Sequence, residues 1–239
     1  MGPEKPVLER MQDQITAWEA VEDRRFIFLS CYAMMTENML AAIQARDFED
    51  VDWVSRLLDH FAEFYFRALQ AYDHDRSESP LVWQIAFEAA RQPKLHVLQN
   101  LVLGVNAHIT YDLVFALSDI LRPEWQNLSK EQRKLRYRDH CHVNDIITRT
   151  IDRVQDQVIE RFDPEIRVID TLLGPIDEWM TSLMIADWRD EVWQHATRLV
   201  EADAETRRQE MEKHVEEFSV RRAQSILGRN GLIGLADLL

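Results

Sequence analysis

Apolar residues recur at intervals of three and four positions along most of the chain, a spacing typical of helices that bury one face. The first such segment runs from roughly Pro6 to Ala45 and includes Ile15, Trp18, Phe26, Leu29, Met35 and Leu40. A second one follows it, from about Val51 to Ala71. No segment alternates apolar and polar residues for long enough to predict a strand. The spacing therefore predicts an all-α fold.

Breaks between these segments are few, because only 6 glycines and 7 prolines interrupt 239 residues. Ser79 and Pro80 predict an N-cap and a first helical position. The pattern S-x-x-Q from Ser129 predicts a capping box. Further breaks are expected at Pro123, Asp163-Pro164 and Gly174-Pro175. We expect a single domain over residues 1–239, an all-α bundle of about seven helices, with the first few residues and a 228–239 tail at its periphery.

The charge balance narrows the range of partners. The chain has 42 acidic and 28 basic residues, a net charge of −14, which repels phosphate backbones, so no nucleic acid partner is expected. No uninterrupted apolar run reaches the ~18–20 residues that cross a bilayer, so no membrane span is expected. The stretch M-G-P-E-K-P-V-L-E-R lacks the apolar core of a signal peptide. Two cysteines are too few for a disulfide framework. We expect a cytoplasmic location, and a homo-oligomer is compatible with the sequence.

Polar residues interrupt the most apolar segment, which is expected to be a helix from about Pro93 to Pro123. Within it the chain reads N-A-H-I-T-Y-D-L. His108 and Asp112 are one helical turn apart at the border of the apolar face, so their side chains are expected to meet and to be partly buried. A buried aspartate needs a cation, a metal or several hydrogen-bond donors. Gly104, a poor helix former, is expected to let a neighbouring helix or a ligand come close.

Two interpretations of this pair remain open on spacing alone. In the first, Asp112 accepts a hydrogen bond from His108 and the pair ties two helices together. In the second, the pair serves catalysis or binds a metal. Because His and Asp often occur four residues apart in helices, the spacing by itself favours the structural interpretation.

A second polar cluster lies in the next expected helix, which runs to about Arg161. It reads D-H-C-H-V-N-D-I-I-T-R-T-I-D from Asp139 to Asp152. Helical bundles usually hold metals with side chains from facing helices, and histidines favour zinc, iron or manganese over magnesium. One hypothesis therefore places a divalent metal, either zinc, iron, manganese or magnesium, between the two helices. Its candidate ligands are His108, Asp112, Asp139, His140, His142 and Asp152.

The same stretch resembles the second metal motif of class I terpene synthases. That motif has an asparagine, a hydroxyl residue four positions on and an acidic residue eight positions on. Asn144, Thr148 and Asp152 match it, with aspartate in place of the usual glutamate. The resemblance implies that this stripe presents oxygen ligands to magnesium bound to a prenyl diphosphate. The upstream aspartate-rich motif of those enzymes has no good match, and much of the charge is otherwise that of a solvated face.

Arg189 is a third candidate, because it lies one turn before Trp193 in a tryptophan-rich segment. Beside the polar cluster it would neutralise a buried carboxylate or bind an anionic group. Otherwise it forms an ordinary ion pair with a nearby acidic residue. The sequence has no glycine-rich phosphate loop, nucleophile elbow or C-x-x-C pair, which excludes many familiar enzyme classes.

Several elements taken together resemble a known family. They are, in order, F-A-E-F-Y, P-L-V-W-Q-I-A-F-E-A-A, V-L-Q-N-L-V-L-G-V-N-A-H-I-T-Y-D-L, D-H-C-H-V-N-D-I-I, I-D-R-V-Q and W-R-D-E-V-W-Q-H-A. They resemble the helical domain-of-unknown-function family numbered fifty-nine ninety-five, over roughly Met34 to Leu199. The resemblance implies a helical fold and a shared polar site, and it supplies no reaction. The family's pattern falls on Trp83, Phe87, Asn106, His108, Asp112, Asp139, Asn144, Asp152, Arg189 and Trp193, whereas His142 and Asp145 lie outside it.

The working hypothesis is an enzyme that acts on a small, largely apolar molecule at a buried site between the 94–121 and 130–161 helices. His108 and Asp112 would act as metal ligands or as an acid/base pair, oriented by Asn106 and Asn144, and Arg189 would bind an anionic group. Two alternatives stand beside it. One is a magnesium-dependent cyclase acting on a prenyl diphosphate, and the other is a non-enzymatic binding or scaffold protein with a buried hydrogen-bond network.

Overall fold

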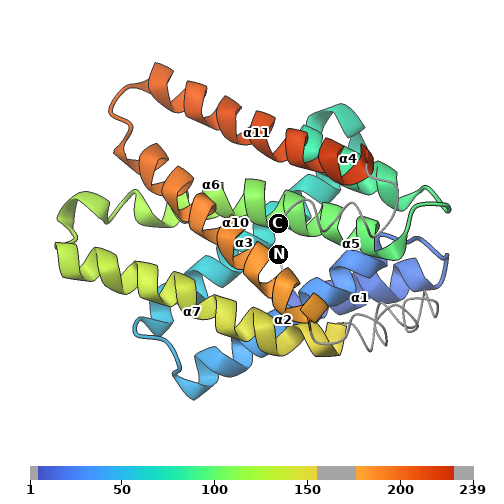
Figure 1. Cartoon of the computed structure of the whole chain (residues 1–239), viewed down its shortest axis with the longest axis horizontal. Coiled ribbons are helices and arrows are strands. Elements are labelled where there is room, and N and C mark those ends of the chain that lie inside the picture. Colours follow the sequence, from blue (N-terminus) through green and yellow to red (C-terminus); the bar gives the residue numbers. More distant parts are fainter. Residues whose placement is uncertain (1–4, 155–175, 229–239) are drawn as a thin grey trace.

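The fold is known from a computed structural model, which describes residues 5–154 and 176–228, with the side chains of residues 152–183 left out. All regular structure in the described residues is helical (Figure 1). The prediction of an all-α bundle of about seven helices is confirmed. The helices are α1 (Val7–Glu19), α2 (Phe26–Ala45), α3 (Val51–His74), α4 (Leu81–Ala90), α5 (Val97–Asn106), α6 (Leu113–Leu121), α7 (Lys130–Val154), α10 (Ile176–Glu201) and α11 (Glu205–Gly228). The shorter helical segments are η1 (Arg76–Glu78), η2 (Ala107–Asp112) and η3 (Trp125–Asn127).

The first expected segment is two helices, although neither glycine nor proline lies between α1 and α2. The turn depends on Glu22, whose φ of 56° is left-handed. The Asp23 carboxylate accepts a hydrogen bond from the backbone N–H of Arg25 at 3.1 Å. A residue other than glycine with positive φ is uncommon, and apolar spacing continues across the turn. The sequence pattern therefore concealed this break.

Two of the expected helix starts have different outcomes. The capping box before α7 is confirmed, since Gln132 Oε1 accepts from Ser129 N at 2.9 Å and Ser129 Oγ accepts from Gln132 N at 3.2 Å. Ser79 does not cap α4, which begins at Leu81. Its hydroxyl donates instead to the carbonyl of Ala68 at 3.0 Å and ties the start of α4 to α3. The breaks expected at 163–164 and 174–175 lie outside the described residues, as does the expected 228–239 tail apart from Gly228, which ends α11.

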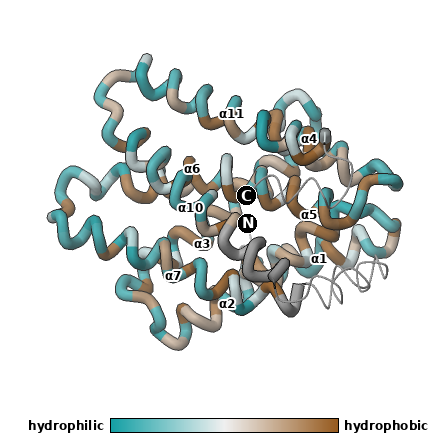
Figure 2. The backbone as a smooth tube through the Cα atoms, viewed as in Figure 1, coloured by the Kyte–Doolittle hydropathy of each residue, from teal (hydrophilic) through white to brown (hydrophobic). Residues whose placement is uncertain are grey.

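A continuous helical rod of α5, η2 and α6 runs through the middle of the bundle from Val97 to Leu121 (Figure 1). Helices α2, α4 and α11 pack against α5, while α3 and α10 pack against α6. The η2 segment contacts α3, α4, α10 and α11. Hydrophobic residues gather along the inner helices, and hydrophilic residues follow the outer stretches of α7 and α11 (Figure 2). The polar stretch of the sequence thus lies where most helices meet.

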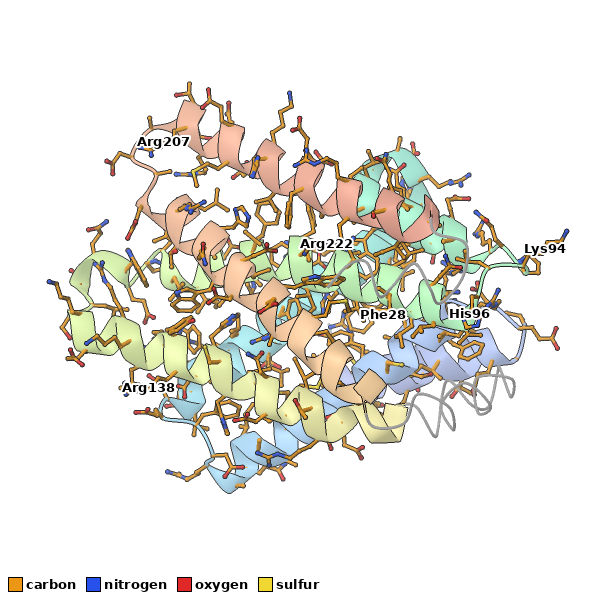
Figure 3. The ribbon with its side chains drawn as sticks, viewed as in Figure 1. Phe28, Lys94, His96, Arg138, Arg207 and Arg222 are labelled. Carbon is orange, nitrogen blue, oxygen red and sulfur yellow. The ribbon has the colours of Figure 1, made fainter. Side chains whose placement is uncertain are left out.

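The side chains show the same division between a hydrophobic interior and a polar periphery. Phe28 lies in the interior, whereas Lys94, Arg138 and Arg207 lie at the periphery (Figure 3). Arg222 lies between α11 and α10, where its guanidinium packs over the ring of Trp188 at 4.4 Å and pairs with Glu191 at 3.0 Å. These contacts attach α11 to the rest of the bundle.

Two helices are long and apolar enough to cross a membrane by length and composition, although the sequence was expected to offer none. They are α2 and the rod from Val97 to Leu121. Polar residues interrupt both, so neither contains the uninterrupted apolar run on which the expectation rested. Of their most apolar windows, 56% and 83% are buried inside the bundle, and core helices pass the same test.

Candidate functional site

The polar stretch of the central rod is a π-helix. Over Ala107–Asp112 the chain departs from α-helical bonding, and the N–H of Leu113 donates to the carbonyl of His108, five residues back. Single π-helical turns are rare and frequently occur at functional sites. The hydroxyl of Thr110 donates to the backbone carbonyl of Asn106 at 2.7 Å and to its Oδ1 at 2.8 Å. This side chain supports the backbone where the π-helix begins.

Asn106 anchors this start to the last helix. Its side chain is fully buried, and Nδ2 donates to the carbonyl of Ser219 on α11 at 3.0 Å. None of its hydrogen bonds goes to His108, which sequence reasoning expected it to orient. Asn106 therefore determines where η2 lies against α11.

His108 and Asp112 meet inside the core. Nδ1 of His108 lies 2.9 Å from Oδ2 of Asp112, and the two side chains are 3% and 1% exposed. The indole Nε1 of Trp83, on α4, donates to Oδ1 and Oδ2 of Asp112 at 3.1 and 3.0 Å. The carboxyl group is thus held by Trp83 on α4 and by His108 on its own helical segment. Its contact with Nδ1 directs the opposite edge of the imidazole, which carries Nε2, away from Asp112.

Aromatic rings enclose this imidazole, and we call them the aromatic cage. Phe61 stacks on His108 with ring centroids 3.7 Å apart and an interplanar angle of 9°. Tyr32 meets it edge-on at 4.3 Å. The remaining members lie 5.9 to 6.1 Å away and are Phe28, Tyr65 and Trp83. The cage is contributed by α2, α3 and α4.

Two polar atoms in the cage, Nε2 of His108 and the hydroxyl of Tyr65, are buried without a hydrogen-bond partner. The hydroxyl of Tyr32 interacts with the side chain of Thr36, one turn further along α2. Buried polar atoms in proteins are nearly always paired, because each unpaired one costs about 1–3 kcal/mol. Nε2 of His108 and the Tyr65 hydroxyl are therefore the polar atoms of the cage that the fold leaves unpaired.

Burial also sets the protonation of the cage. It lowers the pKa of His108 well below its usual range. It raises the pKa of Asp112 well above its usual range, against the opposing effect of the Trp83 N–H. The pKa of Tyr32 is raised by burial first and then by the Asp112 carboxylate. Burial raises the pKa of Tyr65 too, so both tyrosines keep their protons and remain hydrogen-bond donors.

The model of a family of unknown function, DUF5995, matches residues 5–229. The chain belongs to the DUF5995 family. No curated protein and no solved structure matches it. The match spans every helix described above, and with them the cage.

The second polar cluster of this DUF5995 chain lies between α7 and α10. Nε of Arg189 donates to Oδ1 of Asn144 at 2.7 Å, and Nη2 donates to the carbonyl of His140 at 2.7 Å. Nε2 of His140 lies 2.9 Å from the carbonyl of Arg189. Burial lowers the pKa of Arg189 to about 10. These side chains join two helices by satisfying one another, and Arg189 is therefore occupied within the fold.

The other candidate ligands serve neighbouring elements. Both carboxylate oxygens of Asp139 accept from the backbone N–H groups of Glu49 and Asp50 at 2.8 Å, just before α3. His142 lies 3.0 Å from Asp145, a largely exposed residue. Asp152 lies in the last turn of α7, and its side chain is outside the described residues.

The DUF5995 structure does not bring the two clusters into one site. His108 and Asp112 contact α2, α3 and α4, whereas His140 and Asn144 contact α10. Sequence spacing cannot reveal this, because it orients side chains only within their own helix. Within residues 5–151 and 184–228, no three His, Cys, Asp or Glu side chains are grouped to hold a metal.

The stripe that resembled a terpene-synthase motif is engaged as well. Oδ1 of Asn144 accepts from Arg189, and the Thr148 hydroxyl donates to the carbonyl of Asn144 at 3.0 Å. The third position of that motif, Asp152, lies outside the described side chains.

Sequence reasoning missed the polar members of the cage. Tyr32 and Thr36 are one turn apart in α2, and Phe61 and Tyr65 are one turn apart in α3. Both pairs place hydroxyl groups on apolar stripes, which is the signal that could have found them. Because tyrosine and threonine are common in cores, that signal acquires meaning only once the rings are seen around His108.

Proposed function

We propose that this DUF5995 protein is an enzyme that moves a proton on a small, largely apolar molecule, with His108 and Asp112 as its acid/base pair. The observation that carries the proposal is the state of the imidazole. Nδ1 is held by Asp112, while Nε2 is buried and unpaired. A histidine oriented by a carboxylate at one nitrogen and free at the other is the arrangement that general acid–base catalysis requires.

The pair has two protonation forms with opposite abilities. When Asp112 is ionised, Nδ1–H donates to the carboxylate and Nε2 accepts, so the imidazole acts as a base. When Asp112 is protonated, it donates to Nδ1 and Nε2 carries the proton as an acid. Burial raises the pKa of Asp112 well above its usual range, which favours the protonated carboxyl group and with it the acid form of the imidazole. A proton taken up at Nε2 leaves an imidazolium that the Asp112 carboxylate stabilises.

The tyrosines suit the oxygen of a substrate. Burial keeps the hydroxyls of Tyr32 and Tyr65 protonated, so each can donate to a carbonyl or developing oxyanion. The surrounding rings favour an apolar body. Together these features support a neutral substrate with a carbonyl oxygen. His108 would remove a proton from the carbon next to the carbonyl group and would return a proton to the same molecule. This isomerisation needs no co-reactant.

The test is turnover of a metabolite mixture by the purified protein, followed by untargeted mass spectrometry. We expect an isomeric product that wild type forms and that His108→Phe and Asp112→Asn lose by at least about a hundredfold, the usual size of a general acid–base contribution. His60→Phe removes a partly exposed histidine and should leave the product unchanged.

A scaffold protein would give a different result. If no product separates wild type from His108→Phe, and no small molecule copurifies with either, the proposal fails. A product formed equally by wild type and His108→Phe would show that the chemistry lies elsewhere.

A further inference from the structure

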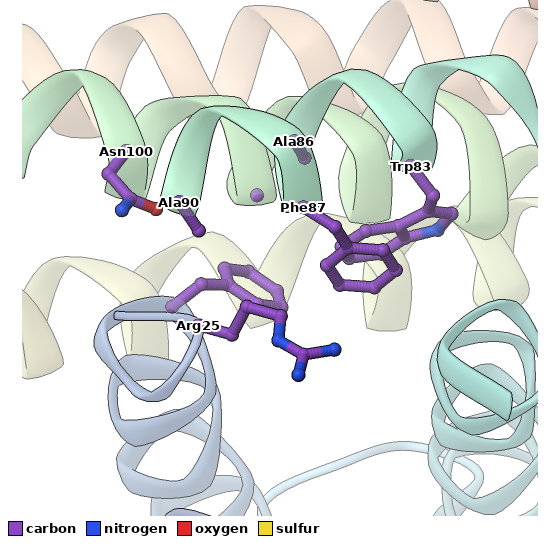
Figure 4. Close-up of a pocket in the computed structure, with 8 residues that line it drawn as sticks. Arg25, Trp83, Ala86, Phe87, Ala90 and Asn100 are labelled. Atoms are coloured by element: carbon purple, nitrogen blue, oxygen red, sulfur yellow. The ribbon is translucent and has the colours of Figure 1, made fainter. Parts of the chain in front are cut away.

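A small pocket lies between the start of α2 and the helices α4 and α5 (Figure 4). Its enclosed space, about 10 Å³, has room for one water-sized group. Phe28 and Trp83 line the pocket and also belong to the aromatic cage, where they are 7% and 1% exposed. An organic molecule therefore has no room to reach His108 from this side.

A different ring of the cage reaches the surface. Phe61 is partly exposed, whereas the other four rings of the cage are between 0% and 7% exposed. His108, on which Phe61 stacks, is 3% exposed. Phe61 is therefore the cage residue that separates the imidazole from solvent.

Only packing holds the Phe61 ring in this position, because a phenyl group has no hydrogen-bonding atom. One contact is the parallel stack on His108. The other is an edge contact with Tyr32, with ring centroids 6.1 Å apart and an interplanar angle of 64°. The ring thus covers a face of the imidazole and lies against the neighbouring Tyr32.

The helix that carries Phe61 is fixed, although the ring itself borders solvent. Leu58, Ala62 and Tyr65 on the same helix, α3, are 7%, 0% and 0% exposed, so they anchor its backbone in the core. An aromatic side chain on a helix has two accessible χ1 positions, near 180° and −60°. A change between them moves the ring off His108 while α3 stays in place, and no buried neighbour has to repack on the solvent side.

We propose that Phe61 is a gate whose ring rotates off His108 to admit a small, largely apolar molecule to the imidazole. With the gate closed, as in the structure, the His108–Asp112 pair is shielded from water. The opening of the ring depends on the contacts of Phe61 alone, whereas its use by a substrate rests on the proposed function.

The experiment measures how fast diethyl pyrocarbonate, a small reagent that acylates imidazole nitrogens, modifies each histidine of the folded protein. Mass spectrometry of the peptides gives a separate rate for His108. This rate should hardly change with urea below the unfolding transition, because rotation of one ring exposes little surface. His140 is 2% exposed and bonded at both ring nitrogens between α7 and α10, so its modification should rise steeply with urea, as global unfolding does.

Two variants locate the opening. Phe61→Ala should raise the rate at His108 at least about tenfold, because no stacked ring then has to move away. The control is Phe64→Ala, since Phe64 is also partly exposed on α3 but packs against His60, with ring centroids 5.2 Å apart. This change should leave the rate at His108 unaltered. If Phe61→Ala fails to fold, the urea series on wild type still decides the question.

Two results would overturn the gate. One is a rate at His108 that rises with urea as steeply as the rate at His140, and the other is a rate that Phe61→Ala leaves unchanged. Failure of the gate and failure of the enzyme are distinguishable. Modification of His108 through the gate without any turnover would sustain the gate and sink the proposed enzyme. Turnover that depends on His108, with His108 modified only on global unfolding, would do the reverse.

Discussion

The imidazole of His108 lies parallel to the phenyl ring of Phe61, with centroids 3.7 Å apart and 9° between the ring planes. Phe61 thus holds the face of the imidazole, and Asp112 holds Nδ1. The remaining nitrogen, Nε2, is buried and has no hydrogen-bond partner. Packing and one hydrogen bond therefore account for where the ring lies, and one ring nitrogen is left unpaired.

This division predicts different costs for two equally buried histidines. His108→Phe keeps the stack on Phe61 but removes the hydrogen bond to Asp112, whose carboxyl group Trp83 still holds, so the free energy of unfolding should fall by only about 1–2 kcal/mol. His140→Phe removes bonds to Arg189 from both ring nitrogens and should cost about 2–4 kcal/mol. Urea unfolding of both variants measures this. Equal losses would show that His108 is a structural residue.

Acid should weaken the fold through His140. Burial lowers the pKa of His140 well below the ~6.5 of an unfolded chain. Below pH ~6.5 the unfolded state binds a proton at His140 and the folded state does not. The contribution of His140 to stability is therefore present above pH ~6.5 and is lost as pH falls. The loss between pH 7 and pH 5 is about 2 kcal/mol. Unfolding of wild type and His140→Gln at both pH values tests it, and equal losses would contradict it.

The His108–Asp112 pair should add little to the loss of stability that acid causes through His140. Burial lowers the pKa of His108 and raises that of Asp112. Between about pH 4 and 6.5 the unfolded chain holds one proton, on His108, and the folded pair also holds one, on Asp112. The proton counts match, so stability from the pair is nearly constant there. It falls as pH rises above about 6.5, and Asp112→Asn should abolish that fall.

Gly104 should tolerate no side chain. A Cβ at this position would lie 2.5 Å from Cγ and Cδ2 of Phe28, because α2 crosses α5 there. The close neighbour expected at Gly104 is thus Phe28. Gly104→Ala should cost about 1–3 kcal/mol from overpacking, despite the better helix propensity of alanine. Gly228, with open space around it, is the control, and Gly228→Ala should be neutral or stabilising. Similar effects of both changes would contradict this packing.

Asp139 should stabilise the start of α3 without taking part in chemistry. Its two oxygens accept from the N–H groups of Glu49 and Asp50, so Asp139→Asn loses one acceptor and should cost about 1–3 kcal/mol. Asp145→Asn, on the surface of the same helix, should change stability by less than about 0.5 kcal/mol. Thermal unfolding of the pair provides the measurement, with turnover unchanged in both. A silent Asp139→Asn would argue against its capping role.

Local geometry explains what could be predicted. Helical spacing placed His108 and Asp112 side by side, and the capping box at Ser129 formed as expected. The same reasoning failed where distant segments meet. It assigned the partners of His108 to α7, but the rings around it come from α2, α3 and α4. It offered Arg189 as an anion site or as half of an ion pair with an acidic residue, and did not anticipate that Asn144 and His140 would accept hydrogen bonds from its guanidinium group.

By itself the sequence determined the all-α class, the polar interruption of the most apolar helix, and the contact between His108 and Asp112, because residues four apart on a helix meet whatever surrounds them. Only the tertiary structure decided that this interruption is a π-helix, that Phe61 and Tyr32 enclose it, and that Nε2 remains unpaired. These features depend on how helices pack, which is set by many weak contacts between residues far apart in the chain. No spacing along one helix encodes them.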